Sequence, residues 1–163
     1  MNIRHATKDD AQALSAIEAA SYPAAEGASA ESIHERLAHY PDYFWLLTTD
    51  TGEIVAFVNG FVTDEKDLAD EMYDHPEMHD AHGAWQMIFF VVTSPAHRGE
   101  GCARKLLERV IADSRAAGRK GIVLTCKERL LPFYAKFGFV DEGISASVHG
   151  NVLWHQTRLR LDG

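Results

Sequence analysis

The chain has 163 residues, of which 46% are apolar and 25% are charged, a composition that suits one globular domain and excludes wholesale disorder. It carries 24 acidic and 16 basic side chains, and its formal net charge of −8 argues against the broad basic surface of a general nucleic-acid binder. The negative charge is concentrated in residues 64–80, which hold eight acids and one base.

The first half of the chain predicts three strands and two helices. Thr7 is a suitable N-cap for a helix that begins near Ala11, and Tyr22-Pro23 is expected to end it. The turn sequence Asp50-Thr51-Gly52 predicts a hairpin, because Asp and Gly tolerate positive φ. In chain order we expect a strand at 2–6, the first helix, a helix at 29–39, and hairpin strands at 43–49 and 54–63.

The second half begins with a continuous apolar run, Trp85–Thr93, which predicts a central strand covered on both faces. There follow a helix between Gly101 and Gly118, a strand at 122–126, a short helix through 133–137, and strands from 138 and over 152–161. This order predicts an α/β (α+β) fold with a mixed, mostly antiparallel sheet of six to seven strands and helices on both faces.

The chain lacks signals for export or for membrane insertion. No apolar run approaches the roughly 18–20 residues that span a bilayer, and the N-terminus has no apolar signal region. Cys102 and Cys126 form neither a CxxC pair nor a disulfide framework. We therefore expect residues 1–163 to form one cytoplasmic, reduced domain with no membrane partner.

The segment Arg98-Gly99-Glu100-Gly101-Cys102-Ala103 lies between a predicted strand and a predicted helix. Glycines let the backbone approach a ligand closely, and the first N–H groups of a helix form a site for a phosphate or pyrophosphate. Arg98, Arg104 and Lys105 add positive charge at this point. The alternative interpretation is an exposed glycine turn ahead of a basic helix.

Two motifs resemble those of the GNAT (Gcn5-related N-acetyltransferase) superfamily. The spacing Arg98-x-x-Gly101-x-Ala103 matches its loop, and Tyr134-x-x-x-Gly138-Phe139 matches a segment that GNAT enzymes often carry. The fuller run from Cys126 to Phe139 is similar to the arylalkylamine N-acetyltransferase branch. The resemblance implies a GNAT fold and an acetyl-CoA co-substrate whose pyrophosphate the loop holds, without a metal. It assigns to acetyl-CoA Phe90, Val91, Val92, Thr93, Arg98, Gly99, Glu100, Gly101, Cys102 and Ala103.

The implied reaction is direct transfer of the acetyl group to a primary amine. An N–H of the strand that contains residues 90–93 would bind the oxyanion, and Tyr134 would give a proton to the CoA thiolate, since a phenol with a pKa of about 10 can protonate a thiolate when held against it. The alternative for Tyr134 is a core aromatic, the role that we expect for Phe133.

The chain differs from the arylalkylamine branch in the residues that would act as the general base. That branch carries two histidines on the central strand, whereas the matching positions here are Trp85 and Met87, which we expect to contact substrate instead. His82 is a candidate base, as are His79 and the acids around it. The alternatives are that His82 is a surface residue, or that the deprotonated fraction of the amine reacts without a dedicated base.

Other reactive side chains have simpler interpretations. His75, His79 and His82 have a spacing that could suggest a metal site, but Pro76 interrupts a helix there, so solvated histidines are favoured. Cys126 is either a nucleophile or a small buried hydrophobe, and we favour the latter. For Cys102 we expect the helix N-terminus to lower the thiol pKa.

The acidic stretch 64–80 has two interpretations. In GNAT folds this region borders the acceptor side, so its carboxylates could attract a cationic amine, with Tyr73 and Trp85 against the apolar part of that amine. Alternatively, it is a solvated amphipathic helix with Leu68 and Met72 facing inward.

Three functions compete. We expect an N-acetyltransferase acting on a small cationic amine; the alternatives are acetylation of a protein lysine or N-terminus, or of an antibiotic amine, and a non-catalytic acyl-CoA sensor. A homodimer could form along the last strand and Trp154, although a core Trp explains that residue equally well.

Overall fold

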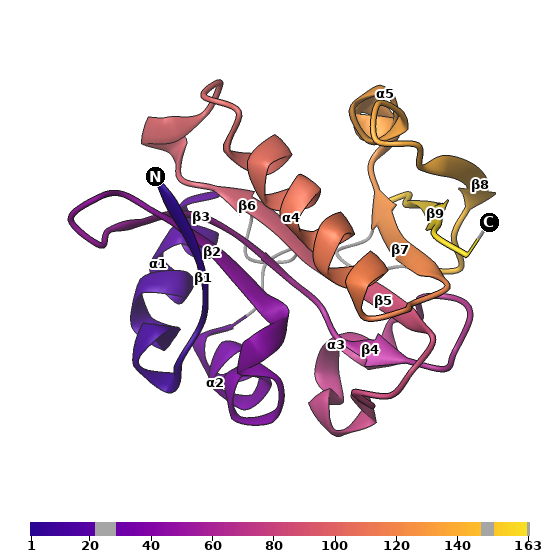
Figure 1. The fold of residues 1–163 in the computed structure, drawn as a ribbon, viewed down its shortest axis with the longest axis horizontal. Helices are drawn as coiled ribbons and strands as arrows, with labels where there is room; N and C mark the ends of the chain where they lie inside the picture. Colours follow the sequence, from indigo (N-terminus) through magenta and orange to yellow (C-terminus); the bar gives the residue numbers. More distant parts are fainter. Residues whose placement is uncertain (22–28, 148–151, 163) are drawn as a thin grey trace. The chain divides into compact units, whose positions relative to one another are not determined.

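The computed structural model describes residues 1–21, 29–147 and 152–162. Over these residues nine strands form a four-stranded and a five-stranded sheet, flanked by helices (Figure 1). The chain divides into two compact units. Unit 1 comprises Met1–Gly60 and Phe90–Val110, and unit 2 comprises Phe61–Phe89 and Ile111–Gly163.

Unit 1 contains the four-stranded sheet, which is antiparallel throughout and ordered β1-β2-β3-β6. The predicted hairpin is confirmed: Gly52 has a φ of 92°, and its N–H donates to the carbonyl of Thr49. The strands of this sheet are β1 (Asn2–His5), β2 (Phe44–Thr48), β3 (Ile54–Asn59) and β6 (Phe90–Thr93).

Both predicted helices of unit 1 are present with their caps. Asp10 accepts the N–H of Thr7 at 2.8 Å in a capping box that begins a 3-10 turn, and α1 (Ala11–Ser21) follows. Ser29 caps α2 (Ala30–His39) by accepting the N–H of Ser32. Helix α1 packs against α2, β3 and β6. The break expected at Tyr22-Pro23 lies outside the described residues. The 3-10 turns of this unit are η1 (Lys8–Asp10), η2 (Pro41–Tyr43) and η4 (Pro95–His97).

Unit 2 contains the five-stranded sheet, ordered β4-β5-β7-β9-β8, in which only β5 and β7 run parallel. Its strands are β4 (Val62–Thr63), β5 (Trp85–Ile88), β7 (Gly121–Cys126), β8 (Val140–Ile144) and β9 (His155–Arg160). The remaining elements of unit 2 are α3 (Glu71–Asp74), α5 (Leu131–Ala135) and the 3-10 turns η3 (Pro76–Met78) and η5 (Glu128–Leu130).

The mixed, mostly antiparallel α/β class is as predicted, but the prediction of one sheet with six to seven strands is corrected. The run 85–93 is two strands that separate at Phe89 and enter different sheets, and 54–63 likewise separates at Gly60 and Phe61. At this break the N–H of Met87 and the side-chain amide of Gln86 both donate to the carbonyl of Phe61, and the Gln86 amide also donates to the carbonyl of Met87. An apolar run has the same sequence pattern whether or not the strand is interrupted, so the pattern does not predict the break.

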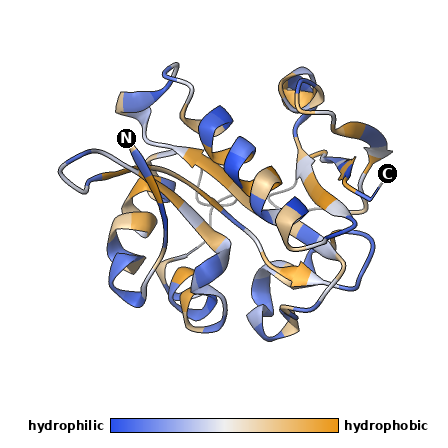
Figure 2. Cartoon of the chain, in the orientation of Figure 1, coloured by the Kyte–Doolittle hydropathy of each residue, from blue (hydrophilic) through white to orange (hydrophobic). Residues whose placement is uncertain are grey.

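Helix α4 (Cys102–Ala116) matches its prediction closely. Its buried side chains recur at helical spacing, and they are Cys102, Leu106, Leu107, Val110 and Ser114. The helix ends in a Schellman motif: Gly118 has a φ of 76°, and the N–H of Arg119 donates to the carbonyl of Ser114. Strands β6 and β7 are coloured hydrophobic along much of their length in Figure 2. Among the described residues, no helix has both the length and the apolar composition needed to cross a bilayer.

Candidate functional site

The loop between β6 and α4 has a backbone that depends on two glycines. Gly99 and Gly101 have φ values of 82° and 78°, in the left-handed region that side chains with a Cβ disfavour. A Cβ at either position would meet no atom within 4 Å. The two glycines are therefore needed for the path of the backbone rather than for close packing, and the loop presents that backbone openly.

The start of α4 presents backbone N–H groups to a ligand. The N–H of Lys105 makes the first helical bond, to the carbonyl of Gly101 at 3.1 Å, so the N–H groups of Cys102, Ala103 and Arg104 come before the helical ladder. Arg98, Arg104 and Lys105 are exposed around them. Backbone donors, the helix dipole and three cationic side chains together suit an anionic group.

Two contacts within the loop between β6 and α4 stabilise its conformation. His97 Nδ1 lies 3.0 Å from Glu100 Oε1, and the Cys102 thiol donates to the carbonyl of His97. Burial, with a smaller contribution from Glu100, raises the pKa of the Cys102 thiol. The expected lowering is thus corrected, since desolvation of the thiolate outweighs the opposing effects of Lys105 and of a backbone hydrogen bond. Cys102 serves to hold the loop.

Strand β6 lies at the edge of the four-stranded sheet. Ser94 donates its N–H to Val55 of β3, and the alternation of an antiparallel pair then directs the backbone groups of Phe90 and Val92 toward β3. The backbone groups of Val91 and Thr93 lie along the opposite edge, where the carbonyl of Thr93 accepts a hydrogen bond from Ser21. An extended ligand chain can align with such an edge.

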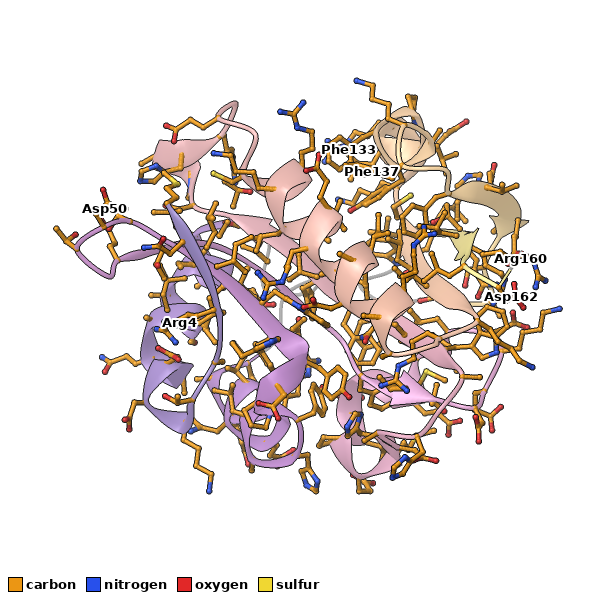
Figure 3. All side chains as sticks on the ribbon, in the orientation of Figure 1. Arg4, Asp50, Phe133, Phe137, Arg160 and Asp162 are labelled. Carbon is orange, nitrogen blue, oxygen red and sulfur yellow. The ribbon has the colours of Figure 1, made fainter. Side chains whose placement is uncertain are left out.

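Tyr134 lies in unit 2 on α5, shortly after the carboxyl end of β7. It is buried, with its ring 5.1 Å from Phe133 and 5.8 Å from Phe139, and its carbonyl accepts the N–H groups of Phe137 and Phe139. Phe133 and Phe137 contact each other at 5.4 Å (Figure 3). The aromatic cluster fixes the tyrosine ring, which suits a positioned proton donor and a core aromatic equally.

Comparisons with known proteins agree with these features. The model of the acetyltransferase (GNAT) family matches residues 11–139, which is most of the chain. The chain belongs to the GNAT acetyltransferase family. It is 32% identical over 59 residues to a probable glucosamine 6-phosphate N-acetyltransferase 2 of Oryza sativa subsp. japonica, covering 36% of each protein. It is 29% identical over 114 residues to the serotonin N-acetyltransferase of Mesocricetus auratus, covering 69% of this chain and 53% of that protein.

The fold is shared with solved structures at lower identity. The GphF GNAT-like decarboxylase in complex with isobutyryl-CoA superposes with a TM-score of 0.84 at 23% identity, over 99% of this chain and 100% of that one. The chain spans only about a third to a half of the length of the curated relatives it matches. The comparisons thus establish the family and the fold of this GNAT protein.

His82 and Tyr134 lie at opposite ends of the parallel pair in unit 2. His82 is exposed on the turn before β5, where its N–H donates to Asp80, in a surface hollow that Asp64 and Arg119 also line. β5 and β7 run parallel, so this turn is at their amino ends, whereas Tyr134 follows the carboxyl end of β7. A strand advances about 3.3 Å per residue, so the six residues of β7 keep the two side chains well apart.

The residues expected to contact substrate differ in their surroundings. Met87 is fully buried, and the buried Trp85 ring packs under Arg158, 4.6 Å from its guanidinium carbon, and directly over Gly121. Both belong to the sheet core as the structure describes it. Tyr73 is also buried, but its hydroxyl lies 3.5 Å from Thr125 Oγ1, near the carboxyl end of β7. Of the three, Tyr73 is at the same end of the strand as Tyr134.

The acidic segment 64–80 contains the short helix α3 and the 3-10 turn η3 instead of a long amphipathic helix, with Leu68 and Met72 buried as expected. Several of its carboxylates hold the protein together. Asp64 accepts the N–H of Ala84 at 3.0 Å, and Asp70 accepts a short hydrogen bond from the Ser147 hydroxyl. Glu65, Glu71 and Asp74 point their carboxylates to solvent as exposed residues.

Sequence reasoning missed Arg158, which is 2% exposed. Its guanidinium contacts Asp67 at 2.6 Å, Glu142 at 2.9 Å and the carbonyl of Lys66 at 2.8 Å. Burial alone would raise the pKa of Glu142, but the hydrogen bonds from Arg158 and Gln156 lower it overall. A basic residue in an alternating strand has no local signal that reveals such partners.

The histidines of the segment have individual partners. His75 pairs with Glu77 at 2.7 Å, and His79 accepts the N–H of Val62 through Nδ1 at 3.1 Å. Over the residues that the structure describes, no group of three His, Cys, Asp or Glu is arranged to hold a metal ion. Burial raises the pKa of the Cys126 thiol to about 11, which suits a small core residue and not a nucleophile.

Proposed function

We propose that residues 1–163 act as one acetyltransferase domain that transfers the acetyl group of acetyl-CoA to a primary amine. The observation that carries this proposal is the loop from Arg98 to Ala103, with its two left-handed glycines at the start of α4. Family membership supports it, because the matched residues 11–139 include this loop and Tyr134.

The cofactor role rests on chemistry that these residues offer. The N–H groups at the start of α4, with Arg98 and Arg104, would bind the pyrophosphate, since they combine donors with positive charge. The edge of β6 would pair with the extended pantetheine arm and donate an N–H to the thioester oxygen. The residues proposed to bind acetyl-CoA remain Phe90, Val91, Val92, Thr93, Arg98, Gly99, Glu100, Gly101, Cys102 and Ala103.

In the proposed reaction the amine nitrogen attacks the thioester carbon, and the C–S bond then breaks. The electron pair leaves on the CoA sulfur, which takes a proton from the hydroxyl of Tyr134. The proton lost by the amine nitrogen returns to solvent or to the tyrosinate, so that the enzyme is restored. The family resemblance supports this role for Tyr134, and its aromatic cluster would hold the ring in place.

For deprotonation of the amine we propose that no dedicated base is needed. The position of His82, at the amino ends of β5 and β7, favours this over His82 as the base. The small neutral fraction of an amine with a pKa of about 10 would then be the reacting species. A rise of kcat/KM with pH that follows the amine's own pKa supports this, and a further pH-dependent step that is lost in His82→Gln would contradict it.

For the acceptor we propose a small cationic amine. The exposed carboxylates Glu65, Glu71 and Asp74 support this choice, because they would raise the local concentration of cations. Protein lysines and N-termini are the alternative acceptors, and their acetylation is an outcome that the same assay distinguishes.

The test is release of free CoA thiol from acetyl-CoA, measured with a panel of arylalkylamines, polyamines, aminoglycosides and short peptides. The proposal predicts amine-dependent release above the background hydrolysis of acetyl-CoA. Tight binding of acetyl-CoA without release for any amine would instead support an acyl-CoA sensor and overturn the enzymatic proposal.

A further inference from the structure

Asn59, the last residue of β3, has a carboxamide with no hydrogen-bond partner among the described residues. Its side chain is 1% exposed, and both Nδ2 and Oδ1 are buried without a partner. Buried amides are nearly always hydrogen-bonded, so an amide with both atoms unpaired calls for a ligand or an ordered water. The acetyl-transfer scheme above leaves this side chain unused.

The neighbours of Asn59 add two polar groups, from Arg36 and Tyr40, to an otherwise apolar face of the sheet. Asn59 is in register with Phe44 of β2 and Phe90 of β6, and directly opposed residues share a face of the sheet. The guanidinium carbon of Arg36 lies 5.2 Å from the Phe90 ring, and the Tyr40 ring stacks on Phe44 at 5.9 Å. The carboxamide, the guanidinium and the phenol thus gather over the ends of three neighbouring strands.

The hydrogen-bonding pattern of Asn59 restricts what it can bind. Its carboxamide offers Nδ2 as a donor and Oδ1 as an acceptor, and both atoms are unpaired. Burial raises the pKa of the neighbouring Tyr40, so its phenol stays neutral, although the charge of Arg36 opposes this. A neutral group that both donates and accepts hydrogen bonds is therefore favoured.

The strand register connects Asn59 to the proposed reaction. Asn59 lies directly opposite Phe90, the first residue of β6, and β6 is the strand proposed to hold the thioester oxygen. An acceptor whose nitrogen reaches that strand would have its adjoining substituent near Asn59. A carboxamide one or two bonds from the amine has the matching donor and acceptor pattern for the Asn side chain.

We propose that Asn59 binds a carboxamide or peptide unit of the acceptor, and that the acceptor is an amine carrying such a unit. This inference rests on the proposed function. Asn59 sets specificity through two hydrogen bonds that only an acceptor with this unit can make.

The experiment compares kcat/KM for alaninamide and isopropylamine, which differ in the carboxamide, between the wild type and Asn59→Leu. The ratio of the two values is the readout, so the different basicities of the amines cancel between proteins. We expect Asn59→Leu to lower the alaninamide-to-isopropylamine ratio about 10- to 100-fold, the effect of losing hydrogen bonds to a buried site. An equal change for both amines would overturn the proposal.

A matched control and a stability measurement separate recognition from folding. Thr48→Val removes another buried polar group of the same sheet, one that donates to Asn2, and should leave the ratio as in the wild type. Asn59→Leu should keep or raise the urea midpoint, because it removes unpaired buried atoms. A midpoint that falls, together with an unchanged ratio, would mean that Asn59 is structural.

A binding measurement, which needs no turnover, tests this inference independently of the proposed function. Calorimetric titration of CoA-saturated protein with N-acetylalaninamide should show about 10-fold weaker binding for Asn59→Leu, even if no amine releases CoA. Equal binding to both proteins would overturn the inference. Alanyl-alaninamide, used beside alaninamide, distinguishes a peptide N-terminus from a small amide as the source of the carboxamide.

Discussion

The Nη2 atom of Arg158 lies 2.6 Å from Oδ1 of Asp67, a contact between residues 91 positions apart in the chain. The guanidinium is buried, whereas the Asp67 side chain is largely exposed. Because Arg158 also donates to the carbonyl of Lys66 and to Glu142, it fastens the beginning of the acidic segment to β8 and β9. Part of the negative charge of this segment therefore serves the fold of unit 2.

Arg158→Met should destabilise the protein by about 2–3 kcal/mol, less than a fully enclosed pair because both carboxylates can still reach water. Urea unfolding measures the effect. Arg160→Met is the matched control: Arg160 is exposed and lies 5.7 Å from the same Trp85 ring, so its loss should cost less than about 1 kcal/mol. Equal losses for the two variants would show that the ion pairs of Arg158 contribute nothing.

Stability at low pH should depend on the capping box of α1. The hydrogen bond from Arg4 lowers the pKa of Asp10, although partial burial works in the other direction. A carboxyl with a depressed folded-state pKa stabilises the protein above its unfolded value of about 4, and this stabilisation is lost as pH falls through the folded pKa. Asp10→Asn should cost about 1 kcal/mol at pH 7 and little at pH 2.5.

Unfolding by urea at the two pH values checks this prediction. Asp9→Asn is the control, because Asp9 is an exposed neighbour in the same turn. If the cost of Asp10→Asn is the same at both pH values, the Arg4–Asp10 pair does not carry the pH dependence.

Local sequence signals predicted the elements whose geometry is itself local. The cap at Thr7, the turn at Gly52 and the helix stop at Gly118 each depend on neighbours within a few residues. The loop at 98–103 could be found for the same reason. The break at Phe89 could not, because it depends on where the strand partners end, and an apolar run carries no sign of that.

The same limit explains why the surroundings of several candidate site residues could not be predicted. The position of Trp85 and His82 at the amino ends of β5 and β7 follows from a parallel pairing that no nearby residue encodes. The role of Arg158 depends on partners far along the chain, and that of Asn59 depends on its having no side-chain hydrogen bond among the described residues. Composition and periodicity describe single elements and leave these relationships open.

Tyr134→Phe should lower kcat about 10²- to 10⁴-fold if the phenol protonates the thiolate. The dissociation constant for acetyl-CoA should change little, since the ring and its contacts with Phe133 and Phe139 stay. Stopped assays of thiol release and calorimetry measure the two quantities. Tyr43→Phe, which removes a hydroxyl from a ring packed on Trp45, is the control and should leave both unchanged. An unaltered kcat in Tyr134→Phe would remove this residue from the mechanism.

The double variant Glu71→Gln, Asp74→Asn removes two exposed carboxylates of the acidic segment and spares Asp67 and Asp70, which hold structural contacts. We expect kcat/KM for a cationic amine to fall about 2- to 5-fold at low salt, and the difference to vanish at high salt as screening removes the attraction. The measurement is a salt series with the same amine. A salt-independent, unchanged kcat/KM would show that these carboxylates do not attract the acceptor.

The central claim is that the loop of Gly99 and Gly101 binds the pyrophosphate of CoA, and calorimetric titration with CoA and with pantetheine, which lacks the pyrophosphate, tests it directly. We predict that the wild type binds CoA at least about 100-fold more tightly than pantetheine, from two or more charge-assisted hydrogen bonds. Gly101→Ala should lower the ratio of the affinity for CoA to that for pantetheine about 10-fold. Gly52→Ala, at a hairpin glycine with a similar φ, should leave this ratio unchanged. Equal affinities of the wild type for CoA and pantetheine would contradict the account.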